Sequence, residues 1–390
     1  MTLVLQGPTL IDGRGGPAVP NVTVVVEDNK IAAVGANGAV QAPRNAEVID
    51  LAGKWLLPGM IDLHIHMYSY DDPPMHRLEP EAYTALLAAR NLKRHLDAGV
   101  TTVRDVGTQR KINISAARAV KLGVIPGPRV FACGQYIAQT GGHGSENPLC
   151  AREADGLADI RLAVREQWKA GADFIKVMLN GYRDVLEFSL EELEALVDES
   201  HRLGMKVACH ASILPAAVNA VKAGVDTIEH GCHFDERVVA GMAEKGIVFV
   251  PTRRVFVGMV ERREELRLRP ESVRILDKRA STHREAIRLA LEAEVKIGAG
   301  TDWSVIFVPD ELVAMVGDGM SPTQAIQAAT RVGAETLGIA NQVGTVEPAK
   351  VADLIVVDRD PLNDISALRE VSTVIQAGKI VKRQVASESV

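Results

Sequence analysis

Two histidines one residue apart, His64 and His66, are the first sign of chemistry in this sequence. They lie in the segment MIDLHIHMY, residues 60–68, behind apolar residues that are typical of a buried strand. Side chains at i and i+2 of a strand point to the same side, so both imidazoles face one space. Neutral imidazole nitrogens are good ligands for a divalent cation of the zinc type. The pair therefore predicts a metal site where this strand ends.

Further titratable side chains stand at or near the ends of later apolar segments: Lys176 in FIKVML, His210 in ACHA, His230 in IEHG and Asp302 in GAGTD. Taken singly, a buried histidine is more often a satisfied core residue than a ligand, and the lysine alone is as easily an ion-pair partner. Coincidence explains the whole set poorly, because the same end of five strands carries it. Together these residues favour a metal-dependent site.

The elements that must position these residues recur as a helical stretch, a glycine and a short apolar strand that ends in polar residues. Five examples are HLDAGVTTVRDVG, WKAGADFIKVML, RLGMKVACHA, VKAGVDTIEHG and AEKGIVFVPT. In each, a glycine stands where a helix would end in a left-handed residue: Gly99, Gly171, Gly204, Gly224 and Gly246. Ser189 and Ser321 each precede Glu or Gln by three residues, which predicts capping boxes at two helix starts.

Adding WLLPGMIDLHIH, PRVFACG and VKIGAGTD gives eight strands. Their nearly continuous apolar runs are typical of a parallel sheet that is covered on both faces. Eight strand–helix units predict an α/β protein with a (β/α)8 TIM barrel over residues 58–344 and the site at the carboxyl ends of its strands.

The two flanks read as short β segments around turn residues, NVTVVVEDNKIAAVG near the start and KVADLIVVDRDPL and VSTVIQAGKIVKR near the end. Neither flank is large enough to bury a core alone. We expect residues 1–57 and 345–390 to join in one small discontinuous β-sandwich domain beside the barrel.

Bulk properties exclude several classes of protein. The length of 390 residues suits one large domain with a smaller one appended, and a net charge of −6 argues against nucleic acid or an anionic membrane as the main partner. The start, MTLVLQGPTLIDGRGG, lacks the basic segment of a signal peptide, and no apolar run is long enough to span a bilayer. Four cysteines without a C-x-x-C pair are too few for a disulfide scaffold, so we expect a cytoplasmic protein.

The order H-x-H, Lys, His, His, Asp on strands 1, 4, 5, 6 and 8 resembles the amidohydrolase superfamily, and the resemblance covers nearly the whole chain. LPGMIDLHIH resembles the segment by which such chains enter the barrel, and VGTVEPAKVADLIVVDRDPL the segment by which they leave it. GPRVFACGQYIAQTGGHG and FIKVML are most similar to the branch of prolidase-like peptidases and Xaa-Arg or Xaa-Pro carboxypeptidases.

The resemblance implies two divalent metal ions, most simply zinc. His64, His66 and Asp302 would hold the first ion, and the second would be held by His210 and His230. Lys176, carboxylated on its ε-nitrogen by CO2, would bridge them. Burial favours the neutral amine that this reaction requires, and a carbamate supplies an anion where an ammonium would repel the metals.

In the implied mechanism, hydroxide held between the two cations attacks an amide-like carbonyl, and Asp302 acts first as general base and then as general acid toward the departing amine. His143, in QTGGHGSE after strand 3, is a candidate second donor to the oxyanion and a substrate contact. Arg253 and Arg254 in VPTRRVF, and Tyr182 in NGYRD, are weaker candidates for substrate binding, one arginine clamping a carboxylate. A solvated loop is the competing interpretation for each.

Dipeptides and N-acyl amino acids are the expected small-molecule substrates, and a homo-oligomer is the expected assembly. The branch also includes hydrolases of aryl amides, carbamates and ureas. A mononuclear deaminase or imidazolone-type hydrolase is a rival that does not use a lysine carbamate, and a non-catalytic barrel is a second rival that would tend to lose ligands.

Four other residues carry expectations. Asp105 in VRDVG is expected to orient a ligand, and Trp303, where such chains usually have a small residue, to reshape the pocket. His95 and His201 lie on predicted outer helices and are expected to face solvent.

Overall fold

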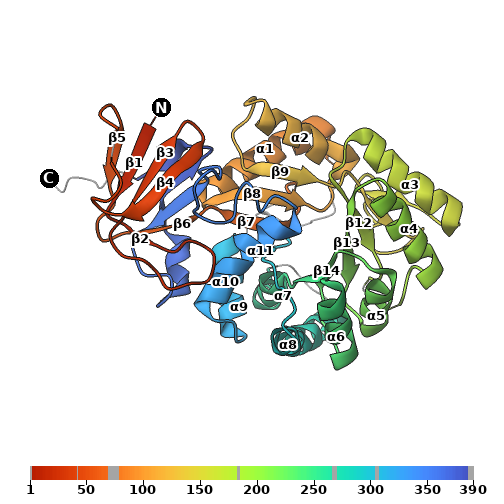
Figure 1. The fold of residues 1–390 in the computed structure, drawn as a ribbon. Helices are drawn as coiled ribbons and strands as arrows, with labels where there is room; N and C mark the ends of the chain where they lie inside the picture. Colours follow the sequence, from red (N-terminus) through yellow and green to blue (C-terminus); the bar gives the residue numbers. More distant parts are fainter. Residues whose placement is uncertain are drawn as a thin grey trace.

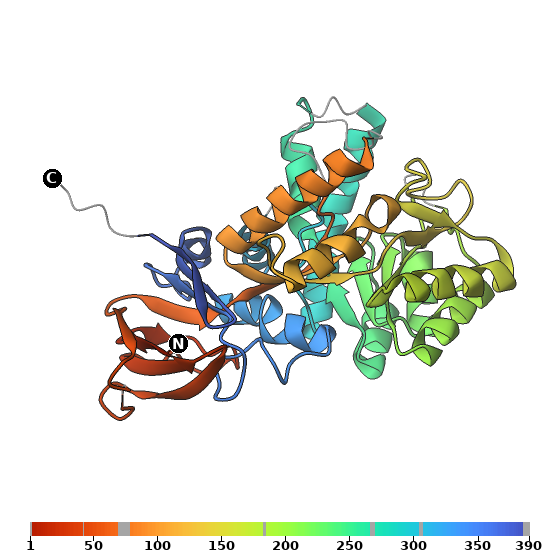
Figure 2. The ribbon, with the colours of Figure 1, turned by 90° about the horizontal axis from the view of Figure 1, so that it is seen from above.

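The computed structural model describes residues 2–41, 43–68, 79–181, 185–265, 270–303 and 307–384. Figure 1 shows two parts side by side, a β-rich part that strands from both ends of the chain build together, and a larger α/β part. Figure 2, seen from above, shows the same arrangement, with the first and last segments of the chain together on one side.

The β-rich part contains two sheets. One has the strand order β4-β3-β1-β5 and the other β18-β17-β16-β6-β2. The first comprises β1 (Thr2–Gln6), β3 (Val22–Glu27), β4 (Lys30–Ala36) and β5 (Glu47–Asp50). The second comprises β2 (Thr9–Leu10), β6 (Trp55–Pro58), β16 (Leu354–Val357), β17 (Val371–Gln376) and β18 (Lys379–Arg383).

One apolar core joins these two sheets. Leu3 and Leu5 of β1 lie two residues apart, on one face of their strand, and belong to the same buried cluster as Leu56 of β6 and Val356 of β16. The N-terminal and C-terminal segments therefore bury their apolar faces against each other, as expected from the sequence.

The α/β part contains two parallel sheets with the strand orders β7-β8-β9 and β11-β10-β12-β13-β14-β15. Their strands are β7 (Met60–Ile65), β8 (Val100–Asp105), β9 (Arg129–Ala132), β10 (Tyr136–Ala138), β11 (Ala151–Glu153), β12 (Phe174–Met178), β13 (Lys206–Ala211), β14 (Thr227–His230) and β15 (Val248–Val250). The Asp173 N–H, just before β12, donates to the carbonyl of Ala132 in β9 at 2.8 Å and links the two sheets.

Residues 296–301, expected as the eighth strand, run between β15 and β7 without forming a regular strand. The Phe249 N–H donates to the Lys296 carbonyl at 2.9 Å, and the Leu63 N–H donates to the Ala299 carbonyl at 2.8 Å. A Cβ on Gly300 would lie 2.7 Å from the Cβ of His64, so only glycine permits this close approach. The segment thus connects the two sheets at the position of His64.

The single strand expected over residues 55–66 is instead divided at Gly59 into β6 and β7. The Gly59 N–H donates to the carbonyl of Asp353 at 2.8 Å, and a Cβ on Gly59 would lie 2.3 Å from Thr101 Oγ1. The close contact with Thr101 requires glycine here, and the chain passes directly from the β-rich part into the strand that carries His64.

Eleven α-helices accompany these strands in the part of the chain that the structure describes. They are α1 (Glu81–Asp97), α2 (Ile112–Lys121), α3 (Gly156–Ala170), α4 (Leu190–Arg202), α5 (Leu214–Ala223), α6 (Glu236–Lys245), α7 (Arg253–Glu261), α8 (Pro270–Glu292), α9 (Val308–Gly317), α10 (Pro322–Ala328) and α11 (Arg331–Thr336). Two short 3-10 helices are η1 (Gln109–Lys111) and η2 (Ile365–Arg369). Both predicted capping boxes, at Ser189 and Ser321, are present, and all five predicted glycines have positive φ.

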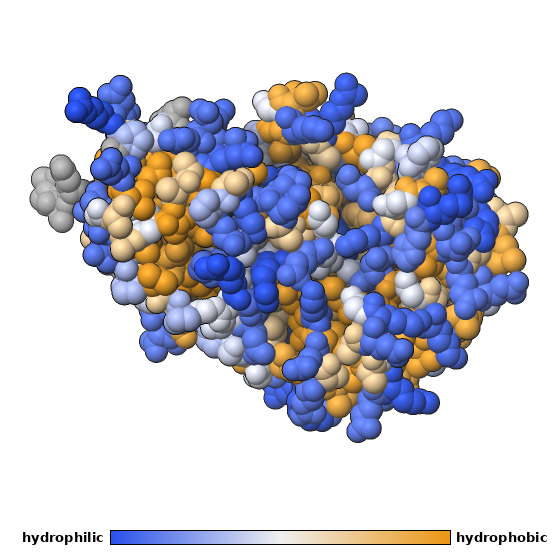
Figure 3. All heavy atoms as spheres, in the orientation of Figure 1, coloured by the Kyte–Doolittle hydropathy of each residue, from blue (hydrophilic) through white to orange (hydrophobic). Residues whose placement is uncertain are grey.

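Hydrophilic and hydrophobic residues are both exposed on the face seen in Figure 3, and hydrophobic ones gather over the β-rich part. Among the described residues, no helix combines the length and the apolar character needed to cross a bilayer. All four cysteines are buried, and none of them is in a disulfide.

Candidate metal centre

Neighbouring strand ends bring the predicted ligands together. In the register of β12 and β13, Met178 pairs with His210, two residues beyond Lys176, and in that of β13 and β14, Ala211 pairs with His230. On the other side, the His64 carbonyl accepts a hydrogen bond from the Asp302 N–H at 2.6 Å. Residues far apart in the sequence thus converge because parallel strands end at one rim.

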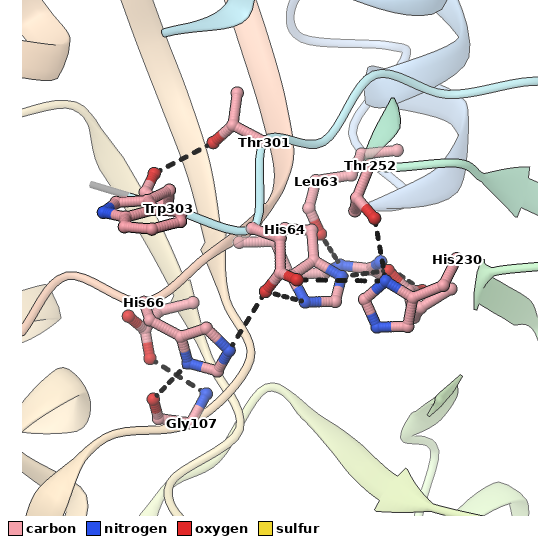
Figure 4. Close-up of polar contacts among 12 residues, drawn as sticks. Leu63, His64, His66, Gly107, His230, Thr252, Thr301 and Trp303 are labelled. Atoms are coloured by element: carbon pink, nitrogen blue, oxygen red, sulfur yellow. Dashed lines mark hydrogen bonds and ion pairs between the residues drawn. The ribbon is translucent and has the colours of Figure 1, made fainter. Parts of the chain in front are cut away.

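His64, His66 and Asp302 form the first group. Asp302 Oδ1 lies 3.1 Å from His64 Nε2 and 3.4 Å from His66 Nε2. One ligand atom from each of these residues lies within 4.8 Å of the others, a spacing that suits a shared cation. Figure 4 shows His64 between His66 and His230. The structure therefore brings together the three residues expected to hold the first metal.

Hydrogen bonds on the opposite ring nitrogens fix the orientation of these histidines. His64 Nδ1 lies 2.6 Å from Glu229 Oε2, and His66 Nδ1 lies 2.9 Å from the Gly107 carbonyl oxygen. A carboxylate and a carbonyl only accept hydrogen bonds, so Nδ1 carries a proton in both rings, and Nε2 is the atom that faces Asp302 and would bind a cation.

His210 and His230 form the second group, with ring centroids 4.4 Å apart. Burial is the main cause that lowers the pKa of both imidazoles well below its usual range, so both rings are neutral. Among the described residues, His210 Nε2 is buried without a hydrogen-bond partner. A neutral imidazole nitrogen that faces no protein donor fits a metal ligand.

Lys176 is 1% exposed, and its Nζ also lacks a hydrogen-bond partner among the described residues. Burial lowers the pKa of its amine, although the charges of Glu229 and Asp302 oppose this effect. An unpaired ammonium in such a place would be costly. The buried amine and the imidazoles around it make a donor set that fits two divalent metal ions bridged by an anion on Lys176.

Asp302 is ionised despite its burial. Burial raises the pKa of its carboxyl group, but the interactions with His64, His66 and His230 outweigh this effect and lower it well below its usual value. The carboxylate can therefore bind a cation or accept a proton.

Three residues of the site have left-handed backbone conformations: His230 (φ 72°), Thr252 (φ 49°) and Asp302 (φ 57°). This conformation is uncommon outside glycine and is a clear outlier for the β-branched threonine. Such strain is concentrated at functional sites, where the surrounding contacts must maintain it.

The residues expected to bind substrate do not all lie at the metal centre. The ring of His143 lies 4.6 Å from that of His210. The backbone N–H of His143 donates to both oxygens of Glu187 at 2.9 Å. The guanidinium of Arg253 instead pairs with Asp318 in a buried contact, which weighs against a role in clamping substrate. Arg254 pairs with Glu261 at 2.7 Å, and Tyr182 lies outside the described residues.

Three charged residues near the centre were missed from the sequence: Arg104, Glu229 and Arg279. Arg104 donates to Glu229 Oε1 at 2.8 Å, so Glu229 connects a buried guanidinium to His64. Both residues interrupt apolar strand segments, VRDVG and TIEHG, and this interruption was the signal that could have revealed them. Arg279 of α8 is 5% exposed and donates to the Gly181 carbonyl at 3.3 Å, next to the loop of His143; no sequence pattern singled it out.

The remaining expectations have mixed outcomes. Asp105 accepts hydrogen bonds from the N–H groups of Met67 at 2.7 Å and Gly107 at 3.1 Å, and thereby orders the backbone around His66. Trp303 is buried in a cluster with residues of α7 and α8 such as Phe256. The expectation that His95 faces solvent was wrong, because its side chain is buried and its ring packs against Phe307.

His201 behaves as expected. Its side chain is 45% exposed, and its Nε2 pairs with Asp226 at 2.8 Å on the surface.

Comparison with known proteins identifies the family. The Amidohydrolase family profile matches residues 55–381. Ochratoxinase from Aspergillus niger is 31% identical to the chain, over 98% of this chain and 87% of that protein. The crystal structure of a Xaa-Pro dipeptidase with bound methionine in the active site is 32% identical, with a TM-score of 0.89, over 98% of this chain and 100% of the other. Imidazolonepropionase from Rhizobium rhizogenes is 24% identical, over 88% of each chain.

These matches imply a TIM barrel with an additional domain, in agreement with the mixed α/β architecture. They also confirm the resemblance to the amidohydrolase superfamily that the order of the histidines, Lys176 and Asp302 indicated, and to its prolidase-like branch that GPRVFACGQYIAQTGGHG and FIKVML indicated. The chain belongs to the amidohydrolase family and is a hydrolase that acts on amide C–N bonds.

Proposed function

We propose that the chain is a two-metal hydrolase of dipeptides or N-acyl amino acids. The observation that carries this proposal is the buried Nζ of Lys176, which has no hydrogen-bond partner among the described residues and lies on the strand next to that of His210. The other support is the set of four histidines and Asp302 at the same rim. We also propose that the eight parallel segments close into a barrel over residues 58–344, with residues 1–57 and 345–390 as the second domain.

In this proposal, His64, His66 and Asp302 would hold one divalent ion, and His210 and His230 would hold the other. Zinc suits both positions, because it accepts imidazole and carboxylate ligands. Lys176, converted to a carbamate, would supply an anionic ligand to both ions. Its neutral Nζ forms a bond to the carbon of CO2 and loses one proton, which leaves an anion with two oxygens. The lowered pKa of the amine favours this reaction, because only the unprotonated nitrogen can add to CO2.

When bound, the two cations would supply a hydroxide nucleophile at neutral pH and polarise the scissile carbonyl. Asp302 accepts the proton of the attacking nucleophile and passes it to the departing amine nitrogen, because an unprotonated amine leaves poorly. His143 donates a ring N–H to the carbonyl oxygen as negative charge develops there.

Substrate recognition follows from the relatives and from charge. The similar proteins include a Xaa-Pro dipeptidase with methionine bound in its active site, which supports a substrate that carries an amino-acid moiety. Since Arg253 is paired with Asp318, we propose the guanidinium of Arg279 as the partner of the substrate carboxylate. Arg254 and Tyr182 stay candidates for other substrate contacts. We further propose that the protein is a cytoplasmic homo-oligomer.

A mononuclear imidazolone-type hydrolase is the second candidate, because imidazolonepropionase is among the relatives. The placement of Lys176 favours the two-metal alternative, since a mononuclear site has no use for a bridging lysine.

The test is a substrate screen with zinc-loaded protein. It compares Xaa-Pro and Xaa-Arg dipeptides, N-acyl amino acids, aryl amides, aryl carbamates and ureas, and it includes N-acyl amines that lack the carboxylate. We expect hydrolysis of the carboxylate-bearing amides and poor hydrolysis of the matched amines. Turnover only of an imidazolone or an aminated heterocycle would contradict the proposal.

Substituting His143 tests the proposed chemistry. H143N should lower kcat about 100-fold, because it removes a donor to the developing oxyanion, and should leave the metal content unchanged. H201N is the matched control, since His201 lies on the surface, and should retain full activity. Wild-type kcat in H143N would exclude His143 from the reaction.

A further inference from the structure

A buried glutamate carboxyl group behind the metal centre holds the first turn of α7. Glu311 of α9 is 0% exposed. Its Oε1 accepts the Arg253 N–H at 2.7 Å, and its Oε2 accepts the Arg254 N–H at 2.6 Å. Both oxygens are therefore used to satisfy N–H groups that the start of a helix otherwise leaves unpaired.

This arrangement replaces the usual cap. Thr252 occupies the N-cap position of α7, where a threonine hydroxyl commonly accepts a hydrogen bond from the helix. Its side chain makes no such bond to the described residues; instead, Oγ1 lies 2.7 Å from Nδ1 of His230. Glu311, which belongs to another helix, accepts the N–H groups at the start of α7. The hydroxyl of Thr252 can therefore contact His230 instead.

The backbone of Thr252 shows what this arrangement requires. The residue has φ 49° and ψ 43°, a left-handed conformation that threonine rarely adopts. Because the two hydrogen bonds of Glu311 fix the residues that follow, they hold this turn in the conformation that directs Oγ1 to His230 (Figure 4 shows the contact).

We propose that Glu311 is a positioning residue for His230 and acts through the first turn of α7 and the hydroxyl of Thr252. The hydroxyl fixes the imidazole by Nδ1, so that Nε2 faces the second metal position. The inference rests on the proposed function, because it takes His230 as a metal ligand. It assigns a role in metal binding to a helix that contributes no ligand of its own.

The test measures metal affinity in the full-length protein. Metal-free wild type, T252V, T252S and E311Q are titrated with Co2+, and the two binding steps are followed by absorbance. T252V keeps the shape of the side chain and removes the hydroxyl, and T252S keeps the hydroxyl. E311Q replaces one of the two acceptor oxygens with an amide nitrogen that cannot accept the second N–H.

We expect T252V and E311Q to weaken one of the two binding steps by about 10- to 100-fold and leave the other near the wild-type value. T252S should bind both ions like wild type. E199Q is the control for a buried carboxylate of purely structural role, because Glu199 of α4 pairs with arginines on the outer helices. It should lower Tm without changing either binding step.

Three results would overturn the inference. The first is wild-type affinity for both ions in a folded E311Q variant, the second is wild-type affinity for both ions in T252V, and the third is a T252S variant as weak as T252V. Failure of the proposed function has a different signature, since wild-type protein would then itself bind fewer than two ions. If E311Q does not fold, the comparison of T252V with T252S still decides the role of the hydroxyl, and E311D, which keeps both oxygens on a shorter side chain, then tests the carboxylate.

Discussion

At the scale of single residues, the centre depends on hydrogen-bond partners that hold His64, His66 and His230 by the ring nitrogen that faces away from the metal positions. Glu229 is the clearest case, because one of its oxygens accepts a hydrogen bond from His64 and the other accepts one from Arg104. Burial raises the pKa of this carboxyl group, but Arg104 and His64 outweigh the effect and lower it below its usual value. The carboxylate is thus ionised. Its contact with Nδ1 orients the ring of His64 so that Nε2 faces the metal position.

Replacing Glu229 with glutamine should therefore weaken metal binding. His64 and Arg104 donate to different oxygens of Glu229, and an amide offers only one acceptor oxygen, so one of these two contacts must be lost. We expect E229Q to bind the ion held by His64 about 10- to 100-fold more weakly, as measured by Co2+ titration. The buried unsatisfied group should also cost about 1–3 kcal/mol of unfolding free energy.

T227V is the matched control for this change. The hydroxyl of Thr227 donates to the same carboxylate, so its removal disturbs the network but keeps the contacts of Glu229 with His64 and Arg104. T227V should lose stability and retain metal affinity. Unchanged metal affinity in E229Q would show that Glu229 does not orient His64.

At the scale of elements, the pattern of apolar residues and the residues typical of helix ends predicted the strands and helices well. The glycines after helices and the capping boxes at Ser189 and Ser321 are local signals, and the structure reproduces them. The residues of the first metal group were also predictable, because the ends of parallel strands must meet.

Long-range contacts account for what the sequence did not reveal. Residues 296–301 are irregular because close packing of Gly300 against His64 decides their path, and no local pattern encodes that contact. The burial of His95 depends on Phe307, more than two hundred positions away in the sequence. Similarly, the pairing of Arg253 with Asp318 is set by the packing of α7 on α9.

Glu199 illustrates how contacts between helices should control acid stability. The carboxylate of α4 accepts hydrogen bonds from Arg165 at 2.7 Å and from Arg202 at 2.5 Å, and these contacts lower its pKa to about 2. A pKa that is lower in the folded state stabilises the fold above the unfolded pKa, and this contribution is lost as the pH falls from about 4 to about 2.

E199Q should therefore lose about 1–2 kcal/mol of unfolding free energy at pH 7, a value reduced for the solvent exposure of the arginines. Its stability should also decline less steeply than that of wild type below pH 4. Urea unfolding across this pH range measures both effects, and E194Q, at an exposed position on the same helix, should match wild type. Parallel acid profiles for E199Q and wild type would contradict the assignment.

At the scale of the whole molecule, the β-rich part and the metal centre share one continuous piece of chain. β6 pairs with β16 in the β-rich part, and one residue later β7 begins and leads to His64. Contacts such as that of Arg129 with Asp353, at 3.1 Å, further join the two parts. Because β16 comes from the far end of the chain, the position of the first metal ligands depends on segments from both termini.

The central claim is that a modified lysine joins two metal ions at the rim. The most direct measurement is a crystal structure of protein loaded with zinc in the presence of bicarbonate, with metal content measured on the same sample. We expect about two ions per chain and electron density for a carboxyl group on Nζ of Lys176. A bare amine at Lys176, with one ion or none beside it in the fully loaded protein, would contradict the account.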